Sequence, residues 1–168
     1  HSERRYVFRE SAKDTRAKVQ AAVRNDIIPI LCVGETAAEK AAGETMGILQ
    51  DQVAGGLANL TAEEVETMVV AYEPVWAISS GKDFANHPIP TMRDAEAAAK
   101  TIRSHITYMF GSKTAKQVRV LYGGSTSAAN AGTFLNSAHI DGLLVGGASL
   151  KVEEFADMIE AAHKRKKA

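Results

Sequence analysis

Short, almost continuous apolar runs alternate along the chain with segments whose apolar residues recur every three or four positions. Continuous apolar runs are typical of strands buried on both faces of a parallel sheet, and the longer spacing predicts amphipathic helices. The apolar runs predict strands at 27–34, 68–77, 118–123 and 141–147. The helical spacing predicts helices at 10–26, 36–60, 92–109, 127–136 and 152–164.

In each predicted helix, the recurring apolar residues mark the face that should lie against the sheet. In the helices before the second strand these residues are Ala12, Val19, Ala22, Val23, Met46, Leu49, Val53 and Leu57. In the later helices they are Met92, Ala95, Ala99, Ile102, Ile106, Met109, Val152, Phe155 and Ile159.

Strand followed by helix occurs four times, after one helix that has no strand before it. This alternation predicts right-handed βαβ units and a parallel sheet. Two architectures fit the pattern: an open doubly wound sheet, or part of an eight-stranded barrel. Four units are only about half of a barrel of ~250 residues. A chain that opens on a polar loop and a helix is expected to be a cut piece of such a fold.

Charge and composition narrow the class of protein. The 168 residues carry 20 Lys plus Arg and 20 Asp plus Glu, so the formal net charge is 0. We therefore expect neither nucleic acid nor a membrane surface as partner, because both favour a basic excess. The basic residues 164–167 are expected to be a solvated helix end. A content of 45% hydrophobic and 24% charged residues is typical of a globular domain.

Cysteine content and apolar run lengths exclude further classes. Cys32 is the one cysteine, so the chain has no internal disulfide and few options for a thiolate metal site. The longest apolar runs are too short to cross a bilayer. The opening HSERR does not resemble a secretory signal, so a reducing, cytoplasmic location is expected.

Three glycine-bearing segments follow predicted strands: 76–82, 122–126 and 143–149. In a parallel α/β fold these strand ends form the ligand-binding face. Glycines let backbone N–H groups approach an anion, and a following helix N-terminus favours negative charge. Tight turns would also use glycine pairs, but two pairs and a third loop at one face favour a phosphate site. The chain lacks the GxGxxG pattern of dinucleotide sites.

Glu73 and His1 are the candidates for acid–base chemistry. Glu73 ends an apolar strand beside Trp76, where poor solvation would raise its pKa toward that of a useful base. An ion pair with a buried Lys or Arg is the alternative role. His1 heads a segment ready to enter a helix, where a neutral imidazole can donate a hydrogen bond; a surface histidine is the alternative. Cys32 is expected to pack as a small hydrophobe.

Five motifs carry a family resemblance: HSERR (1–5), LCVGET (31–36), AYEPVWAI (71–78), LYGGS (121–125) and DGLLVGGASL (141–150). In this order and spacing they closely resemble the triosephosphate isomerase family. The resemblance covers nearly the whole chain but only the C-terminal part of the family's barrel. It implies a parallel (β/α)₈ TIM barrel, here a fragment with about four βα units, strands 5 to 8. Residues 1–168 would then be the C-terminal part of one domain.

The resemblance also implies a reaction, the interconversion of dihydroxyacetone phosphate and D-glyceraldehyde 3-phosphate in glycolysis and gluconeogenesis. Glu73 matches the base, His1 the neutral electrophile, and Glu3 a polar partner near the site. The matching phosphate contacts are Ser79, Ser125, Gly146 and Gly147. The matching lid residues are Pro74, Val75, Trp76, Ala77, Ile78, Ser80, Gly81 and Lys82. No metal or organic cofactor is implied, and the complete protein would be a homodimer that binds a triose phosphate.

The sequence departs from the family pattern in three places. Ser79 stands where the family lid usually has glycine, and the rear hinge reads Lys82-Asp83-Phe84 before a longer segment, 85–91. The third departure is the first barrel half, whose catalytic Lys and neighbouring Asn have no match here. Two alternatives to an isomerase follow: another phosphate-binding barrel enzyme, or an inactive half-barrel that binds at most phosphate or a complementary half.

Overall fold

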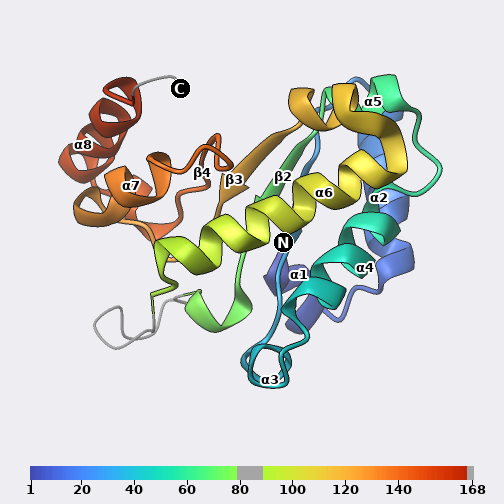
Figure 1. Cartoon of the computed structure of the whole chain (residues 1–168), viewed down its shortest axis with the longest axis horizontal. Coiled ribbons are helices and arrows are strands. Elements are labelled where there is room, and N and C mark those ends of the chain that lie inside the picture. The colour runs from blue at the N-terminus through green and yellow to red at the C-terminus, as the bar shows by residue number, and fades with distance from the viewer. Residues whose placement is uncertain (79–88, 166–168) are drawn as a thin grey trace.

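In the computed structural model, which describes residues 1–78 and 89–165, four strands form a parallel sheet in the order β1-β2-β3-β4 (Figure 1). The strands are β1 (Ile30–Val33), β2 (Val69–Tyr72), β3 (Arg119–Tyr122) and β4 (Gly142–Leu143). Because all three strand pairings are parallel, the carboxyl ends of the four strands lie at the same end of the sheet. The predicted α/β fold with a four-stranded parallel sheet is confirmed.

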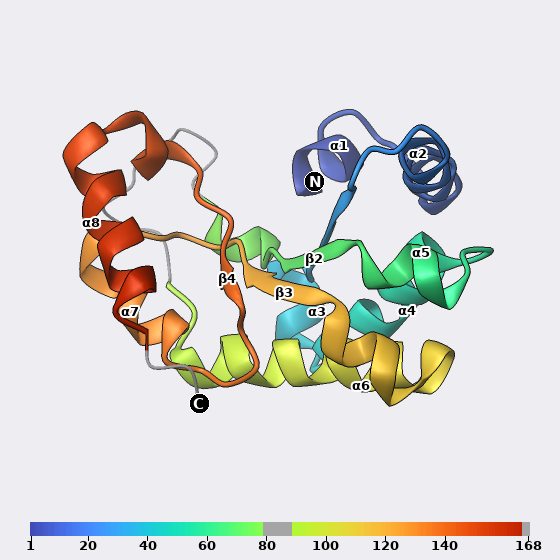
Figure 2. The same cartoon turned by 90° about the horizontal axis from the view of Figure 1, so that it is seen from above.

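Helices connect the strands and cover the sheet (Figure 2). The helices are α1 (Ser2–Tyr6), α2 (Ala12–Arg24), α3 (Ala37–Ala41), α4 (Thr45–Leu57), α5 (Ala62–Glu66), α6 (Met92–Gln117), α7 (Ala128–Leu135) and α8 (Val152–His163). Two short 3₁₀ helices, η1 (Val75–Ala77) and η2 (Gly147–Leu150), follow β2 and β4. Among the helices of the described residues, none is both long enough and apolar enough to cross a membrane.

The main core lies between the sheet and helices α4 and α6. Val53 of α4, Ile102 and Ile106 of α6, and Val70 and Val120 of the central strands are fully buried in one cluster. The three-to-four spacing predicted these helix positions. Burying such side chains contributes about 1.5–3 kcal/mol each, so the helices are held to the sheet mainly by this layer.

The long helix predicted at 36–60 is wrong, because the chain turns between α3 and α4. Gly43 lies between them with φ +74°, a left-handed conformation that ends a helix and suits glycine. Thr36 caps α3 in a reciprocal capping box with Glu39. Beyond the turn, Met46 is exposed at the start of α4, although Leu49 and Val53 further along the same helix are buried as predicted.

The strand predicted at 27–34 is shorter than expected: Leu31, Cys32 and Val33 are buried as predicted, but the residues before them are exposed. Ile27 and Ile28 are each 61% exposed and precede β1, whose own Ile30 is also exposed. β1 is an edge strand of the described sheet, so one of its sides has no neighbouring strand. The predicted strand 141–147 likewise reduces to Gly142–Leu143 at the opposite edge.

The predicted inward face of the last helix is also wrong. Val152 is 80% exposed, and Phe155 and Ile159 are exposed as well, whereas Met158 is buried against α7. Helix α8 packs on α7 and η2, at the end of the sheet where the strands stop (Figure 2). Ala12, predicted on the buried face of α2, is exposed too. Helix α8 therefore leaves most of its predicted inward face exposed, and α2 leaves its first residue exposed.

One ion pair joins α6 to the last two strands. The guanidinium of Arg103 pairs with Asp141 and donates to the carbonyl oxygens of Ala115, at 2.8 Å, and Val118, at 3.1 Å. Asp141 Oδ2 also accepts the backbone N–H of Val120 at 2.7 Å. We expect Arg103→Ala to lower the free energy of unfolding by about 2 kcal/mol or more, because several charge-assisted hydrogen bonds are lost together.

Urea unfolding of both variants checks this expectation against a matched control. Lys100 lies one turn earlier on α6 and forms an exposed pair with Glu96. Lys100→Ala should cost less than about 0.5 kcal/mol. Equal effects of the two substitutions would show that the Arg103 network does not stabilise the fold.

Candidate active site

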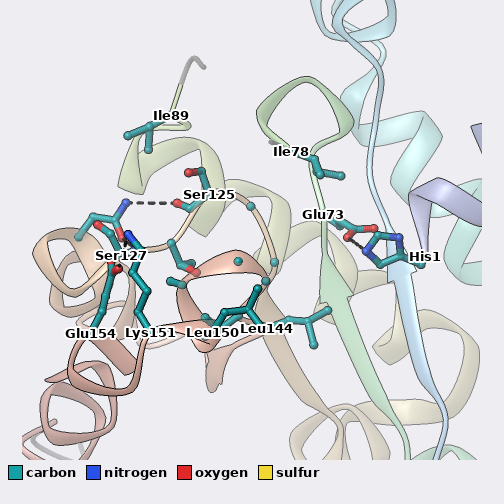
Figure 3. A pocket seen from close by; sticks show the side chains of 18 residues that line it. His1, Glu73, Ile78, Ile89, Ser125, Ser127, Leu144, Leu150, Lys151 and Glu154 are labelled. Atoms are coloured by element: carbon teal, nitrogen blue, oxygen red, sulfur yellow. Dashed lines mark hydrogen bonds and ion pairs between the residues drawn. The ribbon is translucent and has the colours of Figure 1, made fainter. Parts of the chain in front are cut away.

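A cavity of about 740 Å³ lies at the carboxyl ends of the strands (Figure 3). Its lining includes five of the residues singled out in the sequence: His1, Glu73, Ser125, Gly146 and Gly147. They come from four separate parts of the chain. Figure 3 shows Glu73 and His1 at one end and Ser125 at the other, next to helix α8. The fold thus brings a base candidate and a glycine-rich wall to one hollow.

Glu73 and His1 contact each other directly. His1 Nε2 lies 2.6 Å from Glu73 Oε1. His1 Nδ1 accepts the backbone N–H of Glu3 at 3.2 Å, so in this arrangement the imidazole proton is on Nε2. The ring is therefore a neutral imidazole that donates from Nε2. His1 holds this position because it is the N-cap of α1.

The carboxylate of Glu73 is only 3% exposed. Burial raises the pKa of Glu73 above its ordinary value, and the backbone N–H of Ser2 partly opposes this by donating to Oε2 at 2.8 Å. Burial makes the carboxylate a stronger base, while the hydrogen bonds fix its direction. Among the described residues, no partner of Glu73 is the Lys or Arg of the alternative role.

Gly34, at the end of β1, allows the close approach that positions Glu73. A Cβ at residue 34 would lie 2.0 Å from the carbonyl oxygen of Glu73. Gly34 is also held from behind, since its N–H donates to Gln52 Oε1 at 2.8 Å and its carbonyl accepts from Gln52 Nε2 at 3.1 Å. The backbone therefore has little room to withdraw if a side chain is added.

We expect Gly34→Ala to destabilise the protein by about 2 kcal/mol or more, because the added Cβ clashes with the backbone of Glu73, which cannot move aside as a flexible side chain would. Gly47→Ala is the matched control: it lies within α4, and an added Cβ meets no atom within 4 Å. That control should be neutral or stabilising by up to about 1 kcal/mol. Urea denaturation measures both, and a Gly34→Ala variant as stable as Gly47→Ala would contradict the expectation.

The opposite wall of the cavity is built by the loops after β3 and β4. Gly124 leaves the space that the Tyr122 hydroxyl occupies, since a Cβ there would lie 2.2 Å from that oxygen. The carbonyl of Ser125 is held by Asn130 Nδ2 at 3.2 Å. A Cβ at Gly146 would meet nothing within 4 Å, so this stretch of backbone is open to the cavity. Such a wall can present N–H groups to an anion.

The residues that follow Glu73 form the short 3₁₀ helix η1, whose side chains contact Glu35 and Lys40. Trp76 Nε1 donates to Glu35 Oε1 at 2.8 Å, and Tyr72 donates its hydroxyl to the same oxygen at 3.1 Å. Lys40 Nζ lies 4.1 Å from the centroid of the Trp76 ring. Burial beside the Glu35 carboxylate raises the pKa of Tyr72, which keeps the hydroxyl a donor. These contacts anchor the front of the predicted lid.

The remaining predicted residues lie in three different places. Ile78 lines the cavity, whereas Pro74, Val75 and Ala77 belong to the turn beneath it. The side chain of Glu3 is exposed and lies outside the cavity lining. Ser79, Ser80, Gly81 and Lys82 lie outside the described residues.

The structure adds functional candidates that sequence reasoning missed. Glu35 is completely buried, and its Oε2 has no hydrogen-bond partner in the described part of the chain. Lys151 and Glu154 line the cavity beside Ser127 (Figure 3). The LCVGET motif contained Glu35, but no feature of a single sequence tells which of its neighbours a buried carboxylate meets. Lys151 follows the glycine pair by four residues, which was a usable signal.

Metal and thiol chemistry find no support in the described residues. Within 1–78 and 89–165, no group of three or more His, Cys, Asp or Glu side chains is arranged to hold a metal ion. Cys32 is buried, and burial raises the pKa of its thiol to about 11, so it stays protonated at neutral pH. Its expected packing as a small hydrophobe agrees with this burial.

Comparisons with known proteins match nearly the whole chain to one family. A family model described as triosephosphate isomerase matches residues 1–162. Proteins named triosephosphate isomerase from Symbiobacterium thermophilum and Syntrophotalea carbinolica are 43% and 45% identical to it, over 96% and 95% of this chain. One from Citrifermentans bemidjiense is 42% identical over 95% of the chain. The chain spans 61% of the length of each of these relatives.

Proposed function

The chain belongs to the triosephosphate isomerase family, and from this premise we propose that residues 1–168 are the C-terminal part of one (β/α)₈ barrel domain. In this assignment β1 to β4 are barrel strands 5 to 8. The complete protein interconverts dihydroxyacetone phosphate and D-glyceraldehyde 3-phosphate. It acts on this small phosphorylated substrate as a homodimer.

The observation that carries the proposal is the contact between Glu73 and His1 at the head of the cavity. A buried carboxylate lies 2.6 Å from an imidazole nitrogen that bears a proton. An aldose–ketose isomerisation needs this combination, a base for a carbon-bound proton and a donor for the carbonyl oxygen. Both side chains line the cavity that also contains the glycine-rich wall.

The reaction follows from these groups. The carboxylate of Glu73 removes a proton from the carbon beside the carbonyl, and the electron pair of that C–H bond forms the C=C bond of an enediol. The carbonyl π electrons move to oxygen, which takes the proton from His1 Nε2. The hydroxyl of the first carbon then gives its proton back to His1 Nε2 and becomes the new carbonyl. At the same time the C=C electron pair takes the proton from Glu73 at the neighbouring carbon, which gives the isomeric triose and restores both side chains. Because only protons move, the reaction needs no metal or organic cofactor.

The phosphate of the substrate is proposed to bind at Ser125, Gly146 and Gly147, which line the cavity opposite Glu73. Backbone N–H groups at the glycines supply neutral donors that suit a dianion. Residues 74–82 are proposed as the lid, with Ser79 contributing its N–H to the phosphate. Closure would exclude water and protect the enediol.

The pH dependence of the complete enzyme tests this function. Burial raises the pKa of Glu73 above 4.5, and the ionised carboxylate is the active form. The acid limb of kcat/KM should therefore have an apparent pKa above the ordinary glutamate value, when isomerisation is followed from about pH 4 to about pH 9. A limb at or below the ordinary value, or no turnover at all, would contradict the assignment.

The same shift has a consequence for stability. A carboxyl whose pKa is higher in the folded than in the unfolded state binds more protons when folded. The contribution of Glu73 to the free energy of unfolding is therefore fully present below the pKa that this carboxyl has in the unfolded chain. That contribution is lost as the pH rises through the pKa of Glu73 in the folded protein.

An inactive half-barrel is the second candidate, and one observation favours it. Apolar side chains are exposed beside both sheet edges, at Ile28 near β1 and at Val152 beyond β4. In this alternative, residues 1–168 bind phosphate or a complementary half but do not turn over substrate. The assay of the single-chain fusion, described at the end of the Discussion, distinguishes the two, because this alternative predicts no turnover there.

A further inference from the structure

Charged side chains occupy both ends of the cavity (Figure 3). Glu73 and His1 lie at one end, and Lys151 and Glu154 at the other, beside Ser127. Among the described residues that line the cavity, Lys151 is the one Lys or Arg. With the His1 imidazole neutral, two carboxylates and one ammonium give the side chains of the lining a formal charge of −2 + 1 = −1. These side chains therefore offer a phosphate dianion no net attraction unless Lys151 turns toward it.

The geometry leaves Lys151 free to turn. Its Nζ lies 3.4 Å from Glu154 Oε2, and its side chain is 74% exposed while that of Glu154 is 25% exposed. Exposed pairs of this kind are weak, so little is lost when the ammonium moves to another anion. The backbone is fixed, since Lys151 N–H donates to the carbonyl of Ala148 at 3.2 Å. Lys151 directly follows η2, which starts at Gly147 on the proposed phosphate wall.

Helix stability does not explain a lysine at this position. Lys151 is the N-cap of α8 and makes no side-chain capping hydrogen bond there. A cation is unfavourable at a helix N-terminus, where Ser, Thr, Asp or Asn would cap the free N–H groups. Glu154, in the first turn, is favourable to the dipole on its own account. The charge of Lys151 therefore calls for a role outside the helix.

We propose that Lys151 is a binding residue for the substrate's phosphate and that Glu154 holds it over the cavity in the free protein. On binding, the ammonium leaves Glu154 and reaches the phosphate held at Gly146 and Gly147. Lys151 thereby sets the preference for a phosphorylated triose over an uncharged one. This inference rests on the proposed function, because it uses the same phosphate wall.

The test is a titration of the 168-residue chain with inorganic phosphate, in which binding is measured by calorimetry and by changes in amide chemical shifts. We expect Lys151→Met to weaken phosphate binding at least about fivefold and Glu154→Gln to tighten it about twofold, since one removes attraction and the other repulsion. Lys151→Arg should stay within about twofold of the wild type. The Lys151 effect should shrink between about 20 mM and about 200 mM salt, which a purely structural role would not predict.

Matched controls come from the far end of the same helix. Lys164 Nζ and Glu160 Oε1 form another exposed pair on α8 at 2.5 Å, and neither residue lines the cavity. Lys164→Met and Glu160→Gln make the same charge changes and should leave phosphate affinity unchanged. Lys151→Gln serves as a second neutral variant with the same expected loss, and circular dichroism checks that every variant is folded.

The outcomes separate this inference from the function on which it rests. If the wild type binds phosphate and both neutral Lys151 variants bind it equally well, the proposed role of Lys151 is wrong, while phosphate binding at Ser125, Gly146 and Gly147 remains supported. If the wild type binds no phosphate, the proposed phosphate wall and the Lys151 role both fail. Equal losses from Lys151→Met and Lys164→Met would also overturn the inference, because they would reflect net charge alone.

Discussion

Replacing Glu73 with glutamine is expected to lower the kcat of the full-length isomerase by at least ~100-fold, because the amide cannot take up the carbon-bound proton. Glutamine keeps the size of the side chain and one oxygen that can accept the Ser2 N–H, now at 2.8 Å from the carboxylate. The loss should therefore lie in chemistry and not in folding. The loss of kcat is measured from steady-state rates in both directions, with dihydroxyacetone phosphate as substrate in one assay and glyceraldehyde 3-phosphate in the other.

Glu3→Gln provides the matched control for this substitution. Glu3 lies on α1 close to His1, but its side chain is exposed and does not line the cavity. The same carboxylate-to-amide change should alter kcat by less than about threefold there. A Glu73→Gln enzyme that keeps more than a third of the wild-type kcat would remove Glu73 from the role of base.

The second large effect concerns the 168 residues by themselves. We expect this polypeptide to show less than about 1% of the turnover of a full-length relative, because missing electrostatic groups each cost several kcal/mol in the transition state. The family resemblance implies a catalytic Lys and a neighbouring Asn in the first barrel half, for which this sequence has no matching residues. The α-amino group of His1, where the 168-residue chain starts, also adds a charge beside the imidazole.

The sheet edges give this prediction a second readout. β1 and β4 are both edge strands in the described sheet, and edges of this kind invite pairing with another chain. Light scattering should therefore find self-association at the concentrations used for assay. Turnover within tenfold of a full-length relative, from a monodisperse monomer, would contradict both expectations.

The fold class could be predicted from the sequence because the central strands and α6 have the expected apolar spacing and are also buried in the folded protein. Val70 and Val120 lie in apolar runs and are also buried by neighbours on both sides. Ile102 and Ile106 recur at helical spacing and meet that layer. Where pattern and environment agree in this way, periodicity is sufficient evidence.

Prediction failed where burial depends on neighbours that the described chain does not supply. Phe155 has the apolar character and spacing of a core residue, yet it is exposed because α8 has no element on that side. Ile28 fails for the same reason beside β1. The turn at Gly43 was missed for a different reason, since a single glycine within a helical pattern is usually tolerated.

In the candidate site too, some features could be predicted from the sequence and others could not. Glu73 and the glycine pairs belong to recognisable motifs at strand ends, so their meeting in one cavity followed from the parallel topology, whereas His1 was tied to the site by the family resemblance. The space that Gly34 leaves for the Glu73 carbonyl depends on two backbones lying side by side, and no pattern along one of them reveals it. Lys151 was missed because exposed lysines are common and only the cavity distinguishes this one.

A single-chain fusion tests the central claim most directly. The part of the Symbiobacterium thermophilum relative that this chain does not cover, which we propose to be N-terminal, is joined ahead of residues 1–168, and triose phosphate isomerisation is measured. We expect turnover within about tenfold of the intact relative, and a loss of ~100-fold or more from that level when Glu73 is replaced by glutamine. A folded fusion that binds phosphate but shows no turnover above the glutamine variant would contradict the claim that these residues carry the base of an isomerase.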